Sequence, residues 1–398
     1  MSNVPKLRFK EFSGEWEENN LKKLSELITK GTTPKKFSNS GITFVKIEGI
    51  NNLSINKDKC LFIDENTHSK ELKRSILKEQ DILFAIAGSL GKVAVVTKNI
   101  LPANTNQALS IIRLKNKDYL NYILFVLQSR RMKKYIYKNL SVGAQPNLSL
   151  EQIGNFNFFL PLKQEQEKIA SFLTSVDTRI EQLTKKEELL QQYKKGVMQK
   201  IFNQEIRFKA DDGSEFCEWK KEKLSKYLIE YKNKSTFENE YPVLTSSNKG
   251  LMLQSDYFGE NRLTERDNIG FNIVPSNFIT YRSRSDNRTF TFNINTLGYI
   301  GIISTYYPVF ECKNADNRFM VTLLNKNKHF IGKYSVGTSQ TVLSFNELKN
   351  IKMLIPCVEE QTKIANFLSS IDTKIEQTQK QLESSKEFKK ALLQQMFV

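Results

Sequence analysis

The sequence predicts an α+β fold in which two mixed α/β globules alternate with two long helices. Three observations predict it: a helical stretch that occurs twice, short β-like runs before each copy, and matching residues at the edges of the two intervening segments. We expect the helices to pair as an antiparallel coiled coil about a pseudo-two-fold axis. The expected order is a globule over 1–160, a long helix over 161–202, a globule over 203–355 and a long helix over 356–398.

The repeated helical stretch is the strongest of these observations. EQEKIASFLTSVDTRIEQ at 165–182 returns as EQTKIANFLSSIDTKIEQ at 360–377, 195 positions later. When 161–202 is aligned with 356–397, no gap is needed and 20 of the 42 positions are identical. This period is too long for a solenoid repeat of about 20–50 residues. It therefore indicates that a whole domain-plus-helix unit is present twice.

Apolar residues in both copies recur at steps of three and four positions. This spacing is typical of a helix that packs lengthwise against another helix. Glu and Gln gather at the start of each copy and Lys near its end, which suits the helix dipole. The residues expected to pair the helices are Ile169, Leu173, Val176, Ile180 and Leu183 in the first copy and Ile364, Leu368, Ile371, Ile375 and Leu382 in the second.

The two segments before the helices differ in sequence but follow one plan. Runs such as ITFVKI, KVAVVT, FITYRS and TFTFNI indicate strands, and the Asn, Ser, Gly and Lys clusters between them indicate loops. At their edges, RFKEFSGEWEENNLKKLSEL (8–27) resembles RFKADDGSEFCEWKKEKLSKYL (207–228), and SVGAQPNLSLEQI (141–153) resembles SVGTSQTVLSFNEL (335–348). Each unit is thus a lead-in segment, a variable globule, a Gly/Gln loop, a Pro and a long helix.

Composition narrows the partners of the chain. Its 60 Lys and Arg against 43 Asp and Glu give a net charge of +17, which favours nucleic acid as a partner, although a Lys-rich surface without such a partner is the alternative. No apolar run approaches the roughly 18 residues of a membrane span. The first residues, MSNVPKLRFKEF, also lack the apolar core of a signal peptide. We therefore expect a cytoplasmic protein with no membrane partner.

A pseudo-two-fold arrangement suits double-stranded DNA, whose backbone is itself locally two-fold symmetric. Two readers related by such an axis can each enter a groove about one helical turn, or about 34 Å, apart. Because the two globules differ in sequence, the two half-sites that they read should differ in bases.

Polar and basic loops of the globules are the candidate DNA contacts. Asn and Gln pair with adenine and Arg with guanine, whereas Lys, Ser and Thr mostly contact phosphates. The alternative is that these are ordinary exposed loop residues. The first globule offers Lys30, Thr32, Thr33, Lys35, Lys36, Asn39, Ser89, Lys92, Asn104, Asn106, Gln107, Gln145 and Asn147, and the second offers Ser246, Ser247, Asn248, Lys249, Arg282, Arg284, Asn287, Arg288, Ser339 and Gln340.

The whole chain resembles the specificity subunits of type I restriction–modification systems. The resemblance rests on the pattern QxxIAxFLxSxDxxIE at Gln166–Glu181 and Gln361–Glu376, on the Pro before each helix, and on the loops KGTTP (30–34), AGSLGKV (87–93) and SVGAQPNLS (141–149). It implies two target-recognition domains that bind a bipartite, asymmetric DNA sequence. It also implies that the helices are a spacer and a platform for two modification (adenine-N6 methyltransferase) subunits, onto which restriction/translocase subunits dock.

Catalytic motifs are not found, so we expect a non-catalytic subunit. AGSLGKV is not a Walker A loop, because Ile86 stands where its first Gly is required and Val93 where Ser or Thr should follow Lys92. The chain has no Pro-Pro for an amino-methyltransferase loop and no Gly-rich S-adenosylmethionine loop. Four scattered Cys and two distant His indicate no metal site. S-adenosylmethionine, ATP and magnesium are implied by the resemblance for the partner subunits only.

Two other functions remain open from the residues. A coiled-coil scaffold that binds nucleic acid without sequence choice would explain the charge and the helices, but not why the globules diverge while the helices stay alike. A self-contained restriction or modification enzyme would require the motifs that the sequence lacks.

Overall fold

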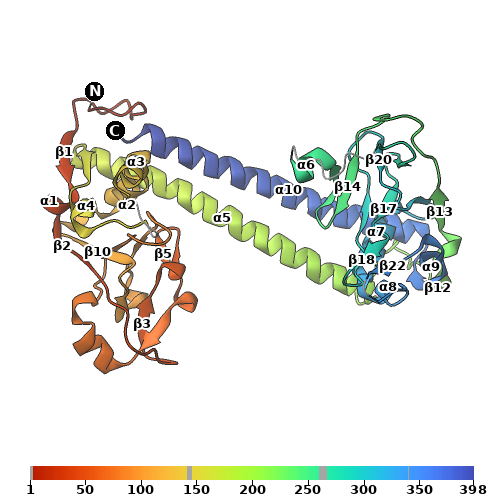
Figure 1. Ribbon diagram of the computed structural model, residues 1–398, viewed down its shortest axis with the longest axis horizontal. Coiled ribbons are helices and arrows are strands. Elements are labelled where there is room, and N and C mark those ends of the chain that lie inside the picture. The colour runs from red at the N-terminus through yellow and green to blue at the C-terminus, as the bar shows by residue number, and fades with distance from the viewer. Residues whose placement is uncertain (1–2, 141–145, 260–266, 339) are drawn as a thin grey trace. The chain divides into compact units, whose positions relative to one another are not determined.

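The computed structural model describes residues 3–140, 146–259, 267–338 and 340–398 (Figure 1). The chain forms two compact units, of which unit 1 comprises Met1–Glu187 and Gln377–Val398, and unit 2 comprises Glu188–Glu376. The two long helices, α5 (Lys163–Phe202) and α10 (Val358–Gln395), each contribute one part to each unit. The units are therefore described one at a time.

Unit 1 is built on a four-stranded antiparallel sheet in the order β2-β10-β7-β8. These strands are Ser25–Lys30, Leu109–Leu114, Ile82–Ala85 and Val93–Val95, respectively. Smaller sheets are β6-β3-β9 (Leu61–Ile63, Ile42–Val45, Ala103–Thr105), β1-β11 (Glu17–Asn20, Asn157–Leu160) and β4-β5 (Ile50–Asn51, Ser54–Ile55). The helices of its globule are α1 (Leu21–Leu24), α2 (Leu120–Gln128), α3 (Arg130–Asn139) and α4 (Leu150–Gly154). Short helical turns are Ile47–Gly49, Lys57–Lys59, Thr67–Glu71, Lys73–Ser75, Lys98–Ile100 and Lys117–Tyr119.

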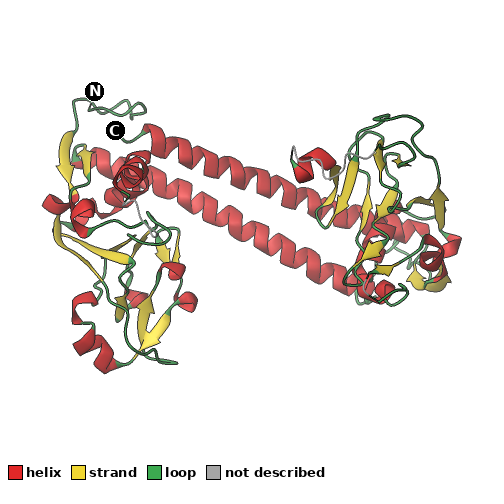
Figure 2. Ribbon diagram, in the orientation of Figure 1, coloured by secondary structure: helices red, strands yellow, loops and turns green. Residues whose placement is uncertain are grey.

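Unit 2 also combines strands with short helices and loops (Figure 2). It has an antiparallel four-stranded sheet in the order β13-β21-β17-β19. These strands are Leu228–Tyr231, Val309–Cys312, Ile279–Tyr281 and Phe292–Ile294. Two-stranded sheets are β12-β23 (Lys220–Lys223, Lys352–Ile355), β14-β15 (Leu244–Ser247, Gly250–Leu253), β16-β20 (Asn272–Val274, Gly301–Ile303) and β18-β22 (Arg284–Ser285, Thr341–Val342). The helices are α6 (Gln254–Phe258), α7 (Asn317–Lys326), α8 (Lys328–Gly332) and α9 (Phe345–Asn350), with a helical turn at Leu224–Lys226.

The two units share one topology. In both, the first and last strands of the globule pair with each other, as β1-β11 and as β12-β23. A short helix with a capping box precedes the last strand: Ser149 and Gln152 cap α4, and Ser344 and Glu347 cap α9. The central sheets follow the same strand order. One plan is therefore used twice, as the similar edges of the two segments predict.

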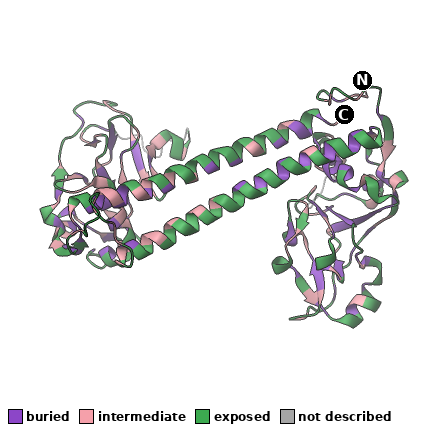
Figure 3. Cartoon of the chain, turned by 180° about the vertical axis from the view of Figure 1, so that it is seen from behind, coloured by how far each residue is buried: buried purple, intermediate pink, exposed green. Residues whose placement is uncertain are grey.

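The long helices run in opposite directions where they meet within each unit. In unit 1, Asp177 of α5 pairs with Lys389 of α10 and Glu187 with Gln379, so positions rise along one helix as they fall along the other. In unit 2, Lys194 pairs with Asp372. Buried positions recur along both helices between exposed ones (Figure 3). This antiparallel contact confirms the predicted α+β class with paired long helices.

The seam residues lie in the hydrophobic cores of the units. Ile169, Leu173, Val176, Ile180 and Leu183 of α5 belong to the unit 1 core, together with Leu382, Leu392, Leu393 and Met396 of α10. Ile364, Leu368 and Ile371 are buried in the unit 2 core, where Ile375 is partly buried. Because the cores also contain sheet and helix residues of the globules, each helix section is held by its own globule as well as by the other helix. No helix in the described part of the chain combines the length and apolar character that a membrane crossing needs.

Candidate nucleic-acid interface

The predicted contacts of unit 1 come from loops that open at one end of its central sheet. The register pairs Lys30 at the end of β2 with Ser110 near the start of β10. It also pairs Ala85 at the end of β7 with Leu109, and Val93 at the start of β8 with Phe84. The loops after β2, before β10 and between β7 and β8 therefore meet at the same end. They carry Thr32 and Thr33, Gln107, and Ser89 and Lys92, all of which are exposed.

Direct contacts hold two of these loops together. A Cβ at Gly31 would lie 1.8 Å from the carbonyl oxygen of Thr105, so only glycine allows the backbones to approach this closely. The Thr32 N–H donates to the Thr105 oxygen at 3.2 Å, and Thr33 Oγ1 donates to Gln107 Oε1 at 2.6 Å. These contacts fix Thr33 and Gln107 side by side at the exposed edge.

The described end of the Gly/Gln loop, from residue 146 onward, joins the same edge. Asn147 forms a β-bridge with Ala87, and the next residue, Leu148, donates its N–H to the Ile86 oxygen at 2.9 Å. The Ile86 N–H in turn donates to the Ala108 oxygen at 2.9 Å, beside Gln107. Asn147 is exposed, and it thus lies on the same edge as Ser89 and Lys92. Gln145 lies outside the described residues.

Arg74 is a residue of this edge that sequence reasoning missed. Its Nη2 donates to Thr32 Oγ1 at 3.3 Å, and its side chain is exposed. Arg74 is 42 positions from Thr32 in the sequence, and no local pattern marks it. Only the tertiary fold places this cation beside the KGTTP loop.

Four of the predicted residues stand apart from this group. Asn104 is fully buried; its Nδ2 donates to the Leu72 oxygen at 3.0 Å and to Ser75 Oγ at 3.1 Å, and its Oδ1 pairs with His68 Nδ1. A DNA contact at Asn104 is therefore not supported, because its polar groups are used inside the fold. Among the described residues, no hydrogen bond or ion pair ties exposed Lys35, Lys36 or Asn39 to the edge.

Asn106 is half-buried, and its Oδ1 accepts the Ala108 N–H at 3.2 Å. This bond shapes the turn that begins β10. Asn106 therefore has a structural role beside exposed Gln107, whichever partner binds there.

In unit 2 six of the ten predicted residues line one hollow of about 560 Å³. Ser246, Ser247 and Asn248 enter it from the end of β14, and Arg282, Arg284 and Asn287 enter it from the segment between β17 and β19. Residues that the prediction did not include also line it: Thr245, Tyr257, Phe258, Ser285, Asp286, Thr289, Thr291 and Tyr307. The hollow is predominantly polar and open, with cationic side chains on one wall.

Side-chain contacts organise this hollow. Asn293 Nδ2 donates to Ser246 Oγ at 2.7 Å, and Thr291 Oγ1 donates to Asn248 Oδ1 at 2.9 Å. The guanidinium carbon of Arg284 lies 4.1 Å from the centre of the Tyr306 ring, which is cation–π geometry. Sequence reasoning missed Tyr306 and Asn293, which contact the lining residues Arg284 and Ser246, because each comes from a segment outside the polar clusters.

The Gly/Gln loop of unit 2 lies beside the arginine-rich segment. Arg284 pairs with Val342 in the β18-β22 ladder, and Arg288 Nη2 donates to the Gly337 oxygen at 3.4 Å. Gln340 Nε2 donates to Asp286 Oδ1 at 3.4 Å. Both units thus bring the Gly/Gln loop against the segment that follows the third strand of the sheet order. Exposed Lys249 lies at the β14-β15 turn, and Ser339 lies outside the described residues.

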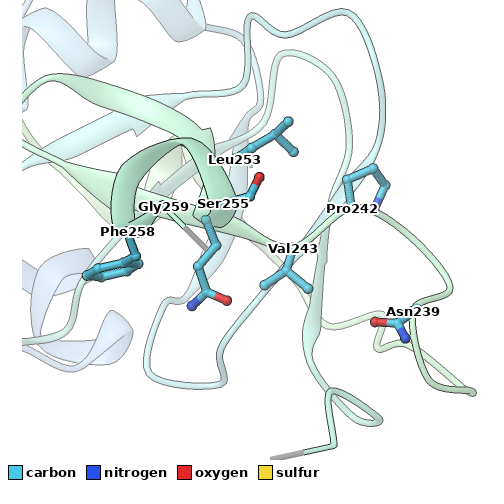
Figure 4. A pocket seen from close by; sticks show the side chains of 8 residues that line it. Asn239, Pro242, Val243, Leu253, Ser255, Phe258 and Gly259 are labelled. Atoms are coloured by element: carbon cyan, nitrogen blue, oxygen red, sulfur yellow. The ribbon is translucent and has the colours of Figure 1, made fainter. Parts of the chain in front are cut away.

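A second hollow of unit 2, about 360 Å³, is mixed in character (Figure 4). It is lined by Asn239, Pro242, Val243, Leu253, Gln254, Ser255, Phe258 and Gly259, and none of the predicted DNA contacts is among them. The polar hollow, and not this one, gathers the predicted residues.

The sequence matches one protein family over most of its length. Residues 13–191 and 214–384 match the family model described as type I restriction modification DNA specificity domain. The chain is 27% identical over 429 aligned residues to a putative type I restriction enzyme MjaX specificity subunit of Methanocaldococcus jannaschii, with 98% of this chain and 95% of the relative covered. It is 26% identical to the type I restriction enzyme MjaVIII specificity subunit of that organism, with 81% and 79% covered.

Solved structures show the same fold. The type I restriction–modification S subunit from M. genitalium superposes with a TM-score of 0.60 at 16% identity, with 99% of both chains covered. A chain of the structure described as the structural basis underlying complex assembly and conformational transition of the type I R-M system gives a TM-score of 0.55 at 14% identity, with 96% of this chain and 97% of that chain covered.

Proposed function

Because this chain belongs to the family of type I restriction modification DNA specificity domains and is a specificity subunit of such a system, we propose that its two units read two different half-sites of one duplex DNA target. The observation that carries the proposal is the repetition of one topology with different side chains. In both units, polar loops lie at the same end of a sheet of the same strand order and meet the Gly/Gln loop there.

The chemistry of the two edges supports unlike half-sites. Unit 1 presents Lys30, Thr33 and Gln107 with Ser89, Lys92 and Asn147, which is a set of amides, hydroxyls and amines. Unit 2 presents Arg282 and Arg284 around a polar hollow. Amides suit adenine in the major groove, and arginines suit guanine. We therefore expect a guanine in the half-site of unit 2 and an adenine contact in that of unit 1.

Methyl transfer and cleavage belong to partner subunits in this proposal. The chain would bind two modification (methyltransferase) subunits, and restriction/translocase subunits would join that complex. S-adenosylmethionine, ATP and magnesium would serve those partners. Exposed aromatic residues at equivalent positions of the long helices support docking there: Tyr193 of α5 in unit 2 is 53% exposed and Phe388 of α10 in unit 1 is 51% exposed. Apolar side chains left in solvent are typical of surfaces that a partner covers.

Mapping methylated adenines tests the proposal. The chain is expressed with its methyltransferase subunits, and modified positions are read across the host genome. We expect a motif of two short, unlike sequences separated by a gap of fixed length in which any base is accepted. A single continuous motif would contradict two-site reading. Methylation without any motif, with DNA binding that collapses at moderate salt, would favour a scaffold that binds without sequence choice.

Exchange of one globule supplies a second test. Replacing residues 1–160 by the corresponding domain of another specificity subunit should change one half of the motif and leave the other half and the gap intact. A change in both halves would show that the two units do not read independently.

A further inference from the structure

Helix α3 of unit 1 carries an excess of positive charge that the predicted DNA contacts do not include. Its sequence, RRMKKYIYKN, contains five cations and no acid. Met132 and Ile136 are buried, and Arg131 is held by the Asn157 oxygen at 2.8 Å and the Val398 oxygen at 3.1 Å. The four other cations are exposed: Arg130, Lys133, Lys134 and Lys138. Among the described residues, none of these four side chains forms a hydrogen bond or an ion pair.

The same charge continues onto the last part of α10 within unit 1. A hollow of about 360 Å³ is lined by Gln128, Arg130 and Lys133 on one side and by Lys386, Lys389, Lys390, Leu393 and Gln394 on the other. The charge of Lys389 is compensated within the fold. Its Nζ lies 2.6 Å from Asp177 Oδ1, which is an ion pair without hydrogen-bond geometry, and it donates to Gln128 Oε1 at 3.2 Å. Lys386 and Lys390 are exposed and have no such partner among the described residues.

Like charges gathered around one hollow repel each other, so an anion bound there would be stabilised. We call Arg130, Lys133, Lys134, Lys138, Lys386 and Lys390 the basic tract. Its position links it to the predicted DNA edge. A Cβ at Gly91, in the loop of Ser89 and Lys92, would lie 3.0 Å from Ile136 Cδ1 of α3. Gln152 Nε2 also donates to the Asn139 oxygen at the end of α3, at 3.1 Å.

We propose that the basic tract binds phosphates of the duplex next to the half-site read by unit 1, without sequence choice. The inference rests on the proposed function, because it places further contacts on the same DNA, next to the half-site that unit 1 reads. From Arg130 to Lys138 the helix rises about 12 Å. Measured along the duplex axis, that length matches roughly three to four phosphates of one strand. Lysines act as point charges on phosphates and carry no base information, which suits a sequence-independent contact.

A phosphate backbone fits this surface better than an acidic protein segment. Protein partners are anchored by buried aromatic and apolar groups. Of the large apolar side chains on α3, Tyr137 alone is strongly exposed among the described residues, at 81%. On α10, exposed Phe388 is offset by about 200° around the helix from Lys386 and from Lys390, so it lies on the face opposite the tract. Helix α3 also packs through Ile136 against the loop that holds Ser89 and Lys92, so the tract and the predicted edge belong to neighbouring elements of unit 1.

Unit 2 repeats the tract only in part. Helix α8, which holds the place of α3 in the element order, has the sequence KHFIG with Lys328 as its one lysine, against the five cations of α3. On α5, Gln191 stands at the position that corresponds to Lys386, and Lys195 at the position that corresponds to Lys390. The sequence-independent contacts are therefore expected to be stronger beside the half-site of unit 1.

Salt dependence of DNA binding tests the proposal on the full chain in complex with its methyltransferase subunits. Two double variants neutralise the tract, Lys133→Gln/Lys134→Gln and Lys386→Gln/Lys390→Gln. The control is Lys59→Gln/Lys98→Gln, which removes two exposed cations near the opposite end of β8. The probes are the duplex defined by methylation mapping and a random duplex of the same length. Each tract variant should flatten the slope of log K against log salt by about 2, and should weaken both duplexes about equally, by roughly tenfold at moderate salt.

The outcomes separate this inference from the function on which it rests. If the wild type prefers its mapped duplex but the tract variants keep the wild-type slope, half-site reading stands and the phosphate tract is wrong. If the tract variants lose their methyltransferase subunits and keep the slope, the surface docks a protein, which also overturns the inference. If the slope flattens although the wild type shows no preference between duplexes, the tract is supported and half-site reading fails.

Discussion

Arg8 and Glu165 join the lead-in segment of unit 1 to the first turn of α5 through a two-bonded ion pair. Nε donates to Oε1 at 2.8 Å and Nη2 to Oε2 at 2.7 Å, and the Glu165 side chain is only 1% exposed. Unit 2 repeats the contact between Arg207 and Glu360, at 3.3 and 2.9 Å. Glu360 also accepts the Trp219 Nε1–H at 3.1 Å, whereas Trp16 Nε1 finds no partner among the described residues of unit 1. The pair explains why the Arg of RFK occurs in both lead-in segments and the Glu of EQ at both helix starts.

Removing the carboxylate should destabilise each unit, and unit 2 more strongly. Loss of one partner of a buried ion pair leaves an uncompensated charge and costs about 3–5 kcal/mol. Glu165→Gln should therefore lower the free energy of unfolding of unit 1 by about 3 kcal/mol. Glu360→Gln should cost about 1 kcal/mol more, because the Trp219 bond is weakened as well. Each unit holds one of the two Trp residues, so denaturation followed by Trp fluorescence reports on both.

The control for this experiment is Glu167→Gln, which changes an exposed carboxylate on the same helix. It should shift stability by less than about 1 kcal/mol, as is usual for surface ion pairs. Equal losses of unfolding free energy for Glu165→Gln and Glu167→Gln would show that the buried pair stabilises unit 1 no more than a surface pair does.

A charge inside the seam of the long helices should impair modification at every target. Leu173 is fully buried in the unit 1 core. Leu173→Asp places a carboxylate among apolar side chains and removes their packing, which together should cost about 3–5 kcal/mol. Because the seam serves both units, we expect methylation to fall at all mapped sites alike while the motif stays the same.

Thr178→Asp is the matched change at an exposed position of α5. It should leave the melting temperature and the level of methylation close to the wild type. If Leu173→Asp altered the motif instead of the overall level, the seam would take part in reading, contrary to this prediction.

The helices could be predicted well from sequence because their signal is local and repeated. An apolar residue at every third or fourth position fixes one face of a helix, and the repeat supplies two independent readings of it. Leu173 and Ile364 are accordingly buried. Ile375 is only partly buried. Its burial depends on how far the neighbouring globule extends along the helix, and the spacing of apolar residues does not predict that distance.

The candidate DNA contacts could be predicted only in part, because the exposure of their side chains depends on strand pairing between distant segments. Asn104 and Gln107 stand in one polar run, ANTNQ, yet the β3-β9 pairing carries Asn104 into the core and leaves Gln107 in solvent. Arg74 contacts Thr32, and Tyr306 contacts Arg284, from other segments of the chain, so no local pattern could identify them.

Asn104 and Gln107 should therefore respond in opposite ways to the same change. Asn104→Ala removes the buried hydrogen bonds of its amide to the Leu72 oxygen, Ser75 Oγ and His68 Nδ1, so it should lower stability by about 2 kcal/mol and keep the motif. Gln107→Ala should keep the melting temperature and relax one or more bases of the unit 1 half-site. Thermal unfolding and methylation mapping of both variants measure the two effects. A motif change in Asn104→Ala without loss of stability would contradict the structural role.

Arg284 should determine a base of the other half-site, with Tyr306 as its positioning residue. The guanidinium lies 4.1 Å from the ring centre, and the β18-β22 ladder fixes the Arg284 backbone. Loss of a bidentate arginine costs about 1–3 kcal/mol against the correct base. Arg284→Ala should thus reduce discrimination about 5- to 150-fold at one base pair of the unit 2 half-site, and leave the unit 1 half-site unchanged. Competition between duplexes that differ at single positions measures this.

Two changes at Tyr306 separate positioning from bulk. Tyr306→Phe keeps the ring and the cation–π contact, so discrimination at the Arg284 base should stay close to the wild type. Tyr306→Leu removes the ring and should lose part of the discrimination that Arg284→Ala loses, with little further loss when both changes are combined, because the two residues act through one contact. Arg318→Ala, which breaks an ion pair on α7 of the same unit, is the control and should leave every base preference intact. Additive losses at Arg284 and Tyr306 would show that the ring acts independently of the arginine.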